Sequence, residues 1–110
     1  MQTTIGFAVI YRWRLHPGKV DQFREQWKRG TQLIMRDEGG LGSRLHQVED
    51  GTWLAYAQWP DKATWEKAAT MNPADSKGRQ LLLDAIAKSY PPVFLTPVAD
   101  YLFQGGIRNS

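Results

Sequence analysis

Residues 7–15, FAVIYRWRL, alternate strictly between two kinds of side chain. The odd-numbered positions carry large apolar and aromatic groups, namely Phe7, Val9, Tyr11, Trp13 and Leu15. The even-numbered positions carry Ala8, Ile10, Arg12 and Arg14. Successive side chains of a strand point to opposite faces of its sheet, so this pattern predicts a strand with one strongly apolar side. The rest of the chain must supply elements that cover that side.

The apolar period lengthens to three and four between residues 19 and 38, which is the spacing of one face of a helix. Its apolar positions are Val20, Phe23, Trp27, Thr31 and Ile34. Gly39–Gly40 ends the helix, since glycine takes the left-handed conformation of a C-terminal cap without steric penalty. The chain has a net charge of +3, but basic and acidic residues are interleaved along this helix. We therefore expect a solvated face here and no nucleic-acid partner, which would need a denser basic patch.

Two more strands are expected at residues 43–49 and 52–59. Asp50–Gly51 lies between them and is a strong hairpin signal, because both residues tolerate the backbone conformation of a tight turn. Pro60–Asp61 then ends the second strand and begins a short helix that carries Trp65.

The C-terminal half of the helical layer is expected in two pieces, because Asn72–Pro73 interrupts the short helix. The second piece runs from Asp75 or Ser76 to Tyr90. Its apolar spacing predicts burial of Leu82, Ala85, Ile86 and Ser89. A last strand covers residues 93–103, and Pro97 confines it to an edge of the sheet or to a bulge, because proline cannot donate a backbone hydrogen bond.

The resulting order, β-α-β-β-α-β with a broken second helix, predicts an α+β fold of the ferredoxin-like kind, an antiparallel sheet with helices on one face. A chain of 110 residues predicts one domain, over residues 1–104, followed by a flexible tail at residues 105–110. The bare face of the sheet would be half apolar, so we expect a second copy of the chain to cover it in a homodimer. RNA-recognition modules share this element order, but TWLAYAQW lacks their basic–glycine pair and adjacent aromatics.

Several kinds of site are excluded by composition. The chain has no cysteine, and its two histidines, His16 and His46, do not have the spacing of a metal site, so no metal is expected. The glycine-rich run at residues 39–43 precedes a strand and lacks the lysine of a phosphate-binding loop. The N-terminal residues do not have the pattern of a signal peptide or a membrane span. We therefore expect a cytoplasmic protein without a membrane partner.

Aromatic residues are concentrated between residues 51 and 69, GTWLAYAQWPDKATWEKAA. Together with the first strand they predict a ring-lined space between sheet and helices, which suits a flat aromatic ligand. The candidate substrate-binding residues are Tyr11, Trp13, Tyr56, Trp59 and Trp65. The pattern leaves open whether the face with Trp53 and Trp59 or the face with Tyr56 meets the helices. Plain core packing is the alternative for each ring.

The candidate catalytic residues are His46 and Arg44, which share one side of the strand at residues 43–49. A histidine has an unperturbed pKa that suits a general base near neutrality, and an arginine can hold an anionic substrate through two hydrogen bonds. The alternative is that both are surface or interface residues.

The order and spacing of YRWRLHPGK, the amphipathic helix, GGLGSRLHQVEDGTWLAYAQWPD and Trp65 resemble the antibiotic biosynthesis monooxygenase family of dimeric α+β barrels. The resemblance covers residues 7–69. It implies a homodimer whose two sheets pack into a barrel, with one pocket in each subunit. Family members include cofactor-free oxygenases of aromatic polyketides, quinol oxygenases and haem-degrading enzymes. By resemblance, Trp59 closes the third strand, and Trp65 is the aromatic residue of the helix after it.

The sequence departs from the haem-degrading branch of that family. Tyr11 stands where that branch has an asparagine, Ala68 stands about where it has a catalytic tryptophan, and no histidine follows His46 to act as axial ligand. The resemblance therefore implies a monooxygenase that uses no cofactor and acts on an aromatic, polyketide- or quinol-like molecule. The alternatives are a non-catalytic small-molecule-binding or stress-related barrel, or an isomerase on the same scaffold.

Overall fold

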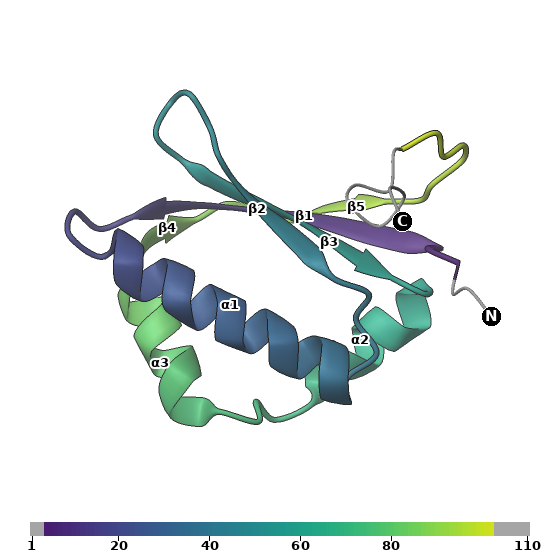
Figure 1. The fold of residues 1–110 in the computed structure, drawn as a ribbon, viewed down its shortest axis with the longest axis horizontal. Helices are drawn as coiled ribbons and strands as arrows, with labels where there is room; N and C mark the ends of the chain where they lie inside the picture. The colour runs from purple at the N-terminus through teal and green to yellow at the C-terminus, as the bar shows by residue number, and fades with distance from the viewer. Residues whose placement is uncertain (1–3, 103–110) are drawn as a thin grey trace, which may run out of the picture.

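The computed structural model describes residues 4–102, so the expected tail at residues 105–110 lies outside the described range. The elements in chain order are β1 (Phe7–Leu15), α1 (Val20–Asp37), β2 (Ser43–Gln47), β3 (Trp53–Trp59), α2 (Lys62–Thr70), α3 (Ser76–Asp84), β4 (Ile86–Ser89) and β5 (Val93–Leu95). The strands form one antiparallel sheet in the order β2-β3-β1-β4, and β5 also pairs with β1. The helices of the described range lie on one side of this sheet (Figure 1). The expected α+β, ferredoxin-like fold is confirmed.

The register between β1 and β3 decides which side chains face the helices. Phe7 lies opposite Trp59 and Trp13 lies opposite Trp53, so the odd-numbered residues of both strands share one face. The Trp13 ring packs edge-on against Phe23 of α1 at 5.1 Å between centroids, which identifies that face as the helix-facing one. The opposite face, called the open face below, carries Ala8, Ile10, Arg12, Leu54, Tyr56 and Gln58.

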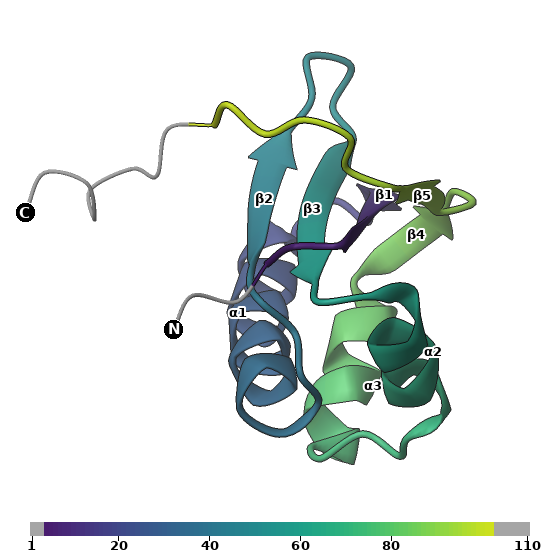
Figure 2. The ribbon, with the colours of Figure 1, turned by 90° about the vertical axis from the view of Figure 1, so that its right-hand side faces the viewer.

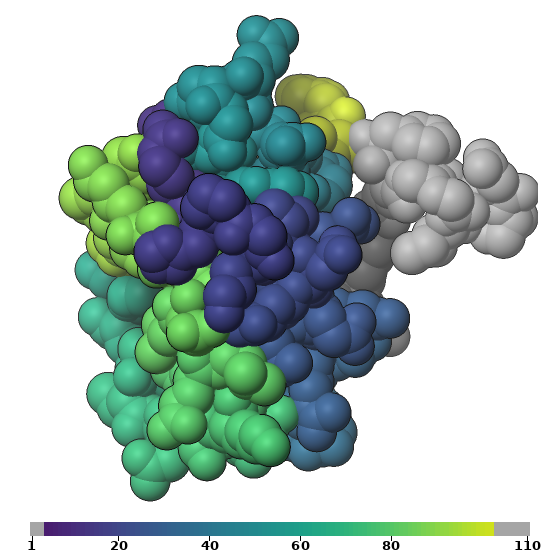
Figure 3. Space-filling model, turned by 90° about the vertical axis from the view of Figure 1, so that its left-hand side faces the viewer, coloured from purple at the N-terminus to yellow at the C-terminus, as the bar shows by residue number. Residues whose placement is uncertain are grey.

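Helices α1 and α3 pack side by side (Figure 3). Polar contacts join them. The Gln22 side chain of α1 donates to the Leu81 carbonyl of α3 at 2.7 Å. Lys19, just before α1, forms an ion pair of 2.6 Å with Asp84, the last residue of α3. These contacts hold α1 and α3 together at the end of the helical layer that is next to the turn between β1 and α1.

The expected helix from residue 75 or 76 to Tyr90 is wrong in its second half. Helix α3 ends at Asp84, and residues 86–89 form strand β4 along the free edge of β1. The backbone N–H of His16 donates to the Ala85 carbonyl at 2.9 Å, and the N–H of Tyr90 donates to the Arg12 carbonyl at 3.0 Å. A helix here would have left this part of β1 without partners, and backbone groups inside a fold need them.

The expected strand at residues 93–103 is also shorter than predicted. Only residues 93–95 pair with β1, as strand β5, and residues 96–102 form no strand. Pro97 lies just beyond the paired residues, where its missing N–H removes no ladder hydrogen bond. Phe103 lies outside the described residues.

The core is centred on the helix-facing side of β1 and β3. Phe7, Val9 and Trp59 are buried together, and Ile34 and Ala68 from α1 and α2 pack against them. Burial of each large apolar side chain contributes about 1.5–3 kcal/mol to the free energy of folding. Trp59, at the end of β3, is therefore a core residue that packs the sheet against the helices.

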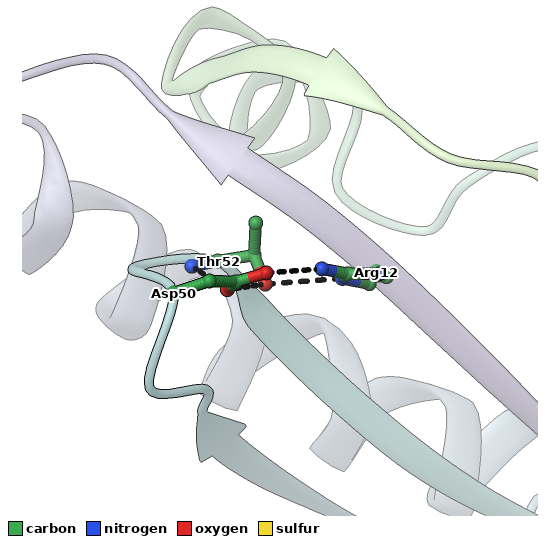
Figure 4. Close-up of polar contacts among 3 residues, drawn as sticks. All are labelled: Arg12, Asp50 and Thr52. Carbon is green, nitrogen blue, oxygen red and sulfur yellow. Dashed lines mark hydrogen bonds and ion pairs between the residues drawn. The ribbon is translucent and has the colours of Figure 1, made fainter.

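The hairpin between β2 and β3 is tied to β1 by a polar network (Figure 4). Thr52 is fully buried, and its N–H and hydroxyl both donate to Asp50, at 2.9 and 2.6 Å. Arg12 of β1 donates to the Thr52 hydroxyl at 3.0 Å and forms an ion pair with Asp50. These contacts, chiefly the hydrogen bonds from Thr52, hold the pKa of the Asp50 carboxyl below its ordinary value.

The variant Asp50→Asn tests this network. A carboxylate whose folded-state pKa is lowered adds stability above its unfolded-state pKa and loses it as the pH falls through the folded value. We therefore expect the variant to unfold at lower urea concentration than the wild type at pH 7. The difference should shrink below pH 3.8, the ordinary aspartate pKa. Glu49→Gln, which removes a neighbouring charge, is the control. Equal stability of Asp50→Asn and wild type at pH 7 would contradict the role of the network.

Candidate functional site

A tyrosine from the sheet and a tryptophan from the helical layer meet at the candidate site. Asp61 caps α2 by accepting from the Thr64 N–H at 2.7 Å, as the sequence predicts, and this fixes the direction of the helix. One turn later, the indole Nε1–H of Trp65 donates to the Tyr11 hydroxyl oxygen at 3.0 Å. The pair links β1 to α2 across the space between sheet and helices.

The Tyr11 phenol is neutral at physiological pH. Partial burial raises its pKa above the ordinary value of 10.0, and this effect outweighs the hydrogen bond from Trp65, which acts in the opposite direction. Since the phenol oxygen accepts from Trp65, the phenol proton is free to be donated to a third group. Tyr11 is therefore suited to donate a hydrogen bond and unsuited to act as a base near neutrality.

Aromatic rings surround this pair. Trp65 lies edge-on to Phe94 of β5 at 5.0 Å between centroids and is tilted against Phe7 at 5.9 Å. On the other side, Tyr11 stacks on Trp13 at 6.0 Å. Phe94 is 49% exposed, so the cluster reaches the surface at β5. Phe7 and Phe94 are not among the site residues expected from the sequence. The register of β5 against β1 brings Phe94 to the helix-facing side, and β5 was expected only as part of a longer strand.

Trp59 contributes a buried donor to the same cluster. Its side chain is 5% exposed, and its indole Nε1–H has no hydrogen-bond partner among the described residues. A buried donor without a partner costs about 1–3 kcal/mol, so few native proteins keep one without a reason. A ligand oxygen that accepted this N–H would recover that free energy.

The substrate-binding residues expected from the sequence lie on both faces of the sheet. Tyr11, Trp13, Trp59 and Trp65 lie on the helix-facing side. Tyr56 lies on the open face, opposite Ile10.

The proposed catalytic pair shares the face of Tyr56. Arg44 lies opposite Tyr56, and His46 lies opposite Leu54. The Arg44 Nε–H donates to His46 Nε2 at 3.0 Å, so the two side chains contact each other as expected from their spacing. Within one chain, however, the sheet separates them from the pair formed by Tyr11 and Trp65.

Tyr56 has a hollow of its own on the open face. The hollow has a volume of about 180 Å³ and lies between β1, β3 and the segment that follows β5. Ala8 and Tyr56 form its floor from the sheet, and Leu95 and Leu102 are among the residues that enclose it. This volume is smaller than the roughly 300–1,000 Å³ of typical small-molecule sites.

Between residues 4 and 102, no three histidine, aspartate or glutamate side chains gather closely enough to hold a metal ion. Over the same range, no helix is both long and apolar enough to cross a lipid bilayer.

Comparison with known proteins places these features in a family context. The model of a family described as antibiotic biosynthesis monooxygenase matches residues 6–72. No curated protein sequence matches the chain. Similar solved structures include SnoaB, a cofactor-independent oxygenase from Streptomyces nogalater, at 16% identity and a TM-score of 0.72, covering 89% of this chain and 98% of SnoaB.

Two other solved structures show the same fold. The monooxygenase ActVA-Orf6 from Streptomyces coelicolor, in complex with nanaomycin D, is 24% identical, with a TM-score of 0.67. The match covers 91% of this chain and 94% of ActVA-Orf6. Rv0793 from Mycobacterium tuberculosis is 14% identical, with a TM-score of 0.69. The match covers 87% of this chain and 98% of Rv0793.

A double-mutant cycle on Tyr11 and Trp65 measures the central hydrogen bond of the site. Tyr11→Phe leaves the Trp65 N–H without its acceptor and should lower the free energy of unfolding by about 1 kcal/mol. We expect a coupling energy of about 0.5–1.5 kcal/mol between Tyr11→Phe and Trp65→Phe in urea unfolding. Tyr56→Phe on the open face is the control for loss of a phenol. A coupling energy of zero would show that the bond contributes nothing to stability.

Proposed function

Because the chain belongs to the antibiotic biosynthesis monooxygenase family, whose model matches residues 6–72, we propose that it is a cofactor-independent monooxygenase. Its substrate is an aromatic molecule with oxygen substituents, of the polyketide or quinol kind. It binds between sheet and helices, at the cluster that contains Tyr11, Trp59 and Trp65. Two proteins of similar structure, SnoaB and ActVA-Orf6, are an oxygenase and a monooxygenase, which supports this assignment.

The observation that carries the proposal is the unpartnered, buried N–H of Trp59 within an aromatic cluster. Tyr11 supplies a second donor, since its oxygen is already occupied by Trp65 and burial keeps the phenol protonated. Aromatic walls with a few polar donors suit a flat ring whose oxygen atoms accept hydrogen bonds. Donors of this kind also stabilise negative charge on such an oxygen.

The chemistry follows from the electron-rich character of such a substrate. Once the substrate loses a proton to solvent water, its anion passes one electron to dioxygen, and the resulting radical and superoxide join through a new carbon–oxygen bond. Protonation gives a hydroperoxide. Its oxygen–oxygen bond then breaks as the carbon loses a proton, which leaves a carbonyl group and water. One oxygen atom ends in the product and the other in water, so the substrate supplies all the electrons.

The protein's part in this scheme is to bind the ring, exclude water and hold the anionic oxygen. Tyr11 and Trp59 donate to that oxygen, and Trp65 orients Tyr11. Trp13 extends the aromatic wall. Three other candidate residues, Tyr56, Arg44 and His46, lie on the open face, where the proposed second subunit packs. They can influence the reaction only through that interface.

A second candidate function is small-molecule binding without oxygenase chemistry, as in a stress-related barrel. The position of His46 favours it, because the only general-base candidate of the sequence analysis lies across the sheet from the aromatic cluster. A site that binds and shields an aromatic molecule needs the rings and the donors but no base.

We also propose that the chain forms a homodimer through its open face. That face includes the partly exposed apolar side chains of Ile10 and Tyr56. After β5 the chain passes over β3 on the same side, away from the helices (Figure 2), with Val98 95% and Tyr101 96% exposed. Apolar area of this kind on a sheet favours a second subunit.

Oxygen uptake tests the proposed activity. With anthrone or 1-naphthol, purified protein should consume one dioxygen per product formed, without added flavin or haem and unchanged by a chelator. Tyr11→Phe should lower kcat/KM by about 100-fold, the usual effect of removing one donor to a developing anion. Tyr90→Phe outside the cluster is the matched control, and heat-denatured protein measures the uncatalysed rate. Stabilisation by the ligand without oxygen uptake above that rate would favour the binding function.

Light scattering at micromolar concentration tests the dimer. The expected mass is about 25 kDa, twice the 12.6 kDa of one chain. Ile10→Lys on the open face should shift the mass toward that of one chain, because it places a charge in the proposed interface. A wild-type mass of one chain throughout a hundredfold concentration range would exclude the dimer.

A further inference from the structure

Three aromatic rings, from β1, α2 and β5, lie in mutual contact beside the Tyr11–Trp65 pair. The ring centroids are 5.9 Å apart for Phe7 and Trp65, 6.1 Å for Phe7 and Phe94, and 5.0 Å for Trp65 and Phe94. We propose that Phe94 is the gate of the candidate site: its ring must move aside before a substrate reaches Trp59, and the width of the resulting opening limits the width of the substrate. The inference rests on the proposed function and adds a specificity-determining residue to it.

Phe94 is the outermost member of the aromatic cluster. Phe7 is 4% exposed and Trp59 is 5% exposed, whereas Phe94 is 49% exposed. The register places Phe94 opposite Val9 of β1, and Phe7 opposite Trp59 of β3, so the rings follow one another from the edge of the sheet inward. The indole N–H of Trp59 has no partner among the described residues. A molecule that approaches this N–H from the edge of the sheet therefore meets Phe94 first.

The other side of Trp59 is closed by the segment that follows α1. Gly40 is buried there, and a Cβ atom added to it would lie 2.7 Å from the Ile34 side chain and 3.7 Å from the Trp59 ring. Not even a methyl group fits at this position unless Ile34 moves, and tightly packed interiors resist such shifts. The route past β5 is therefore the less tightly packed of the two.

Phe94 is also the ring whose backbone is held by the fewest contacts. Phe7 belongs to the nine-residue strand β1, which pairs with β3 along most of its length. Trp65 belongs to α2 and donates to Tyr11 at 3.0 Å. Phe94, in contrast, is the middle residue of a three-residue strand that pairs, within the described range, only with β1. A segment with few hydrogen bonds and an exposed side chain opens at low cost in free energy.

Prolines on both sides of β5 keep this strand short. Pro91 and Pro92 precede it, and Pro97 follows it after one residue. Since proline has no backbone N–H, none of them can add a donor to the pairing with β1. The open state of a two-state element is typically populated at roughly 0.1–10%. A ligand that binds only the open state associates more slowly by the same factor.

The test measures ligand association without turnover, by tryptophan fluorescence in a stopped-flow instrument under anaerobic conditions. Phe94→Ala should raise the association rate of anthrone, which has three fused rings, at least about tenfold. The dissociation rate should rise as well, because a gate slows passage in both directions. The rise should be smaller for 1-naphthol, whose two fused rings need a narrower opening. An unchanged association rate with faster dissociation would identify Phe94 as a wall of the site only and overturn the proposal.

Val93→Ala is the matched control. Val93 is next to Phe94 in β5 and is 51% exposed, but it lies opposite Ile10 and therefore on the open face. Its truncation should leave both rates unchanged. Phe94→Leu keeps an apolar side chain and should give an intermediate rise, and urea unfolding checks that each variant is folded. Equal effects of the Phe94 variants on the two ligands would contradict a role in selecting the width of the substrate.

Hydrogen exchange tests the gate without any ligand. Because the Trp59 indole N–H has no hydrogen-bond partner among the described residues, its exchange with solvent reports access alone. Followed by NMR, the exchange should be faster in Phe94→Ala and Phe94→Leu than in the wild type or in Val93→Ala. Equal exchange rates in all four proteins would overturn the gate. Absence of oxygen uptake, or of binding by either ligand, would count against the proposed function alone, because the exchange requires neither oxygen nor substrate.

Discussion

The antiparallel register of β1 against β3 is the constraint on which the rest of the structure depends. Because Phe7 lies opposite Trp59 and Trp13 opposite Trp53, both strands present their rings to the same side. A slip of one residue would turn one strand's rings away from the helices and bring Tyr56 toward them. The core and the bond between Tyr11 and Trp65 both follow from this single alignment.

The elements with a strong local signal were predictable from the sequence. The strict alternation of β1, the period of α1 and the hairpin at Asp50–Gly51 each depend on residues close together in the chain. Strand β4 was not predictable in this way, because Leu82, Ala85 and Ile86 keep a helical spacing across the point where α3 ends. What makes residues 86–89 a strand is the open edge of β1, some 70 positions earlier, and no local pattern reports it.

The candidate site was predictable in part for the same reason. Alternation shows that Trp59 and Tyr56 point to opposite faces, but it does not say which face meets the helices. The pairing with β1 decides this, and it separates His46 and Arg44 from Tyr11. The bond from Trp65 to Tyr11 and the unpartnered N–H of Trp59 depend on the distance between α2 and the sheet, which only the folded chain defines.

The pairing of β1 with both β4 and β5 has a consequence for how the protein is made. Of the strands in this sheet, β1 leaves the ribosome first, and its partners include the two that leave last, at residues 86–89 and 93–95. Until those residues emerge, β1 has one unpaired edge along an apolar face, and contacts between such distant parts of a chain form slowly. The nascent chain therefore completes its sheet only after residue 95 has emerged. Shielding of β1 from aggregation during translation falls to α1 and β3, the elements that appear before the edge is closed.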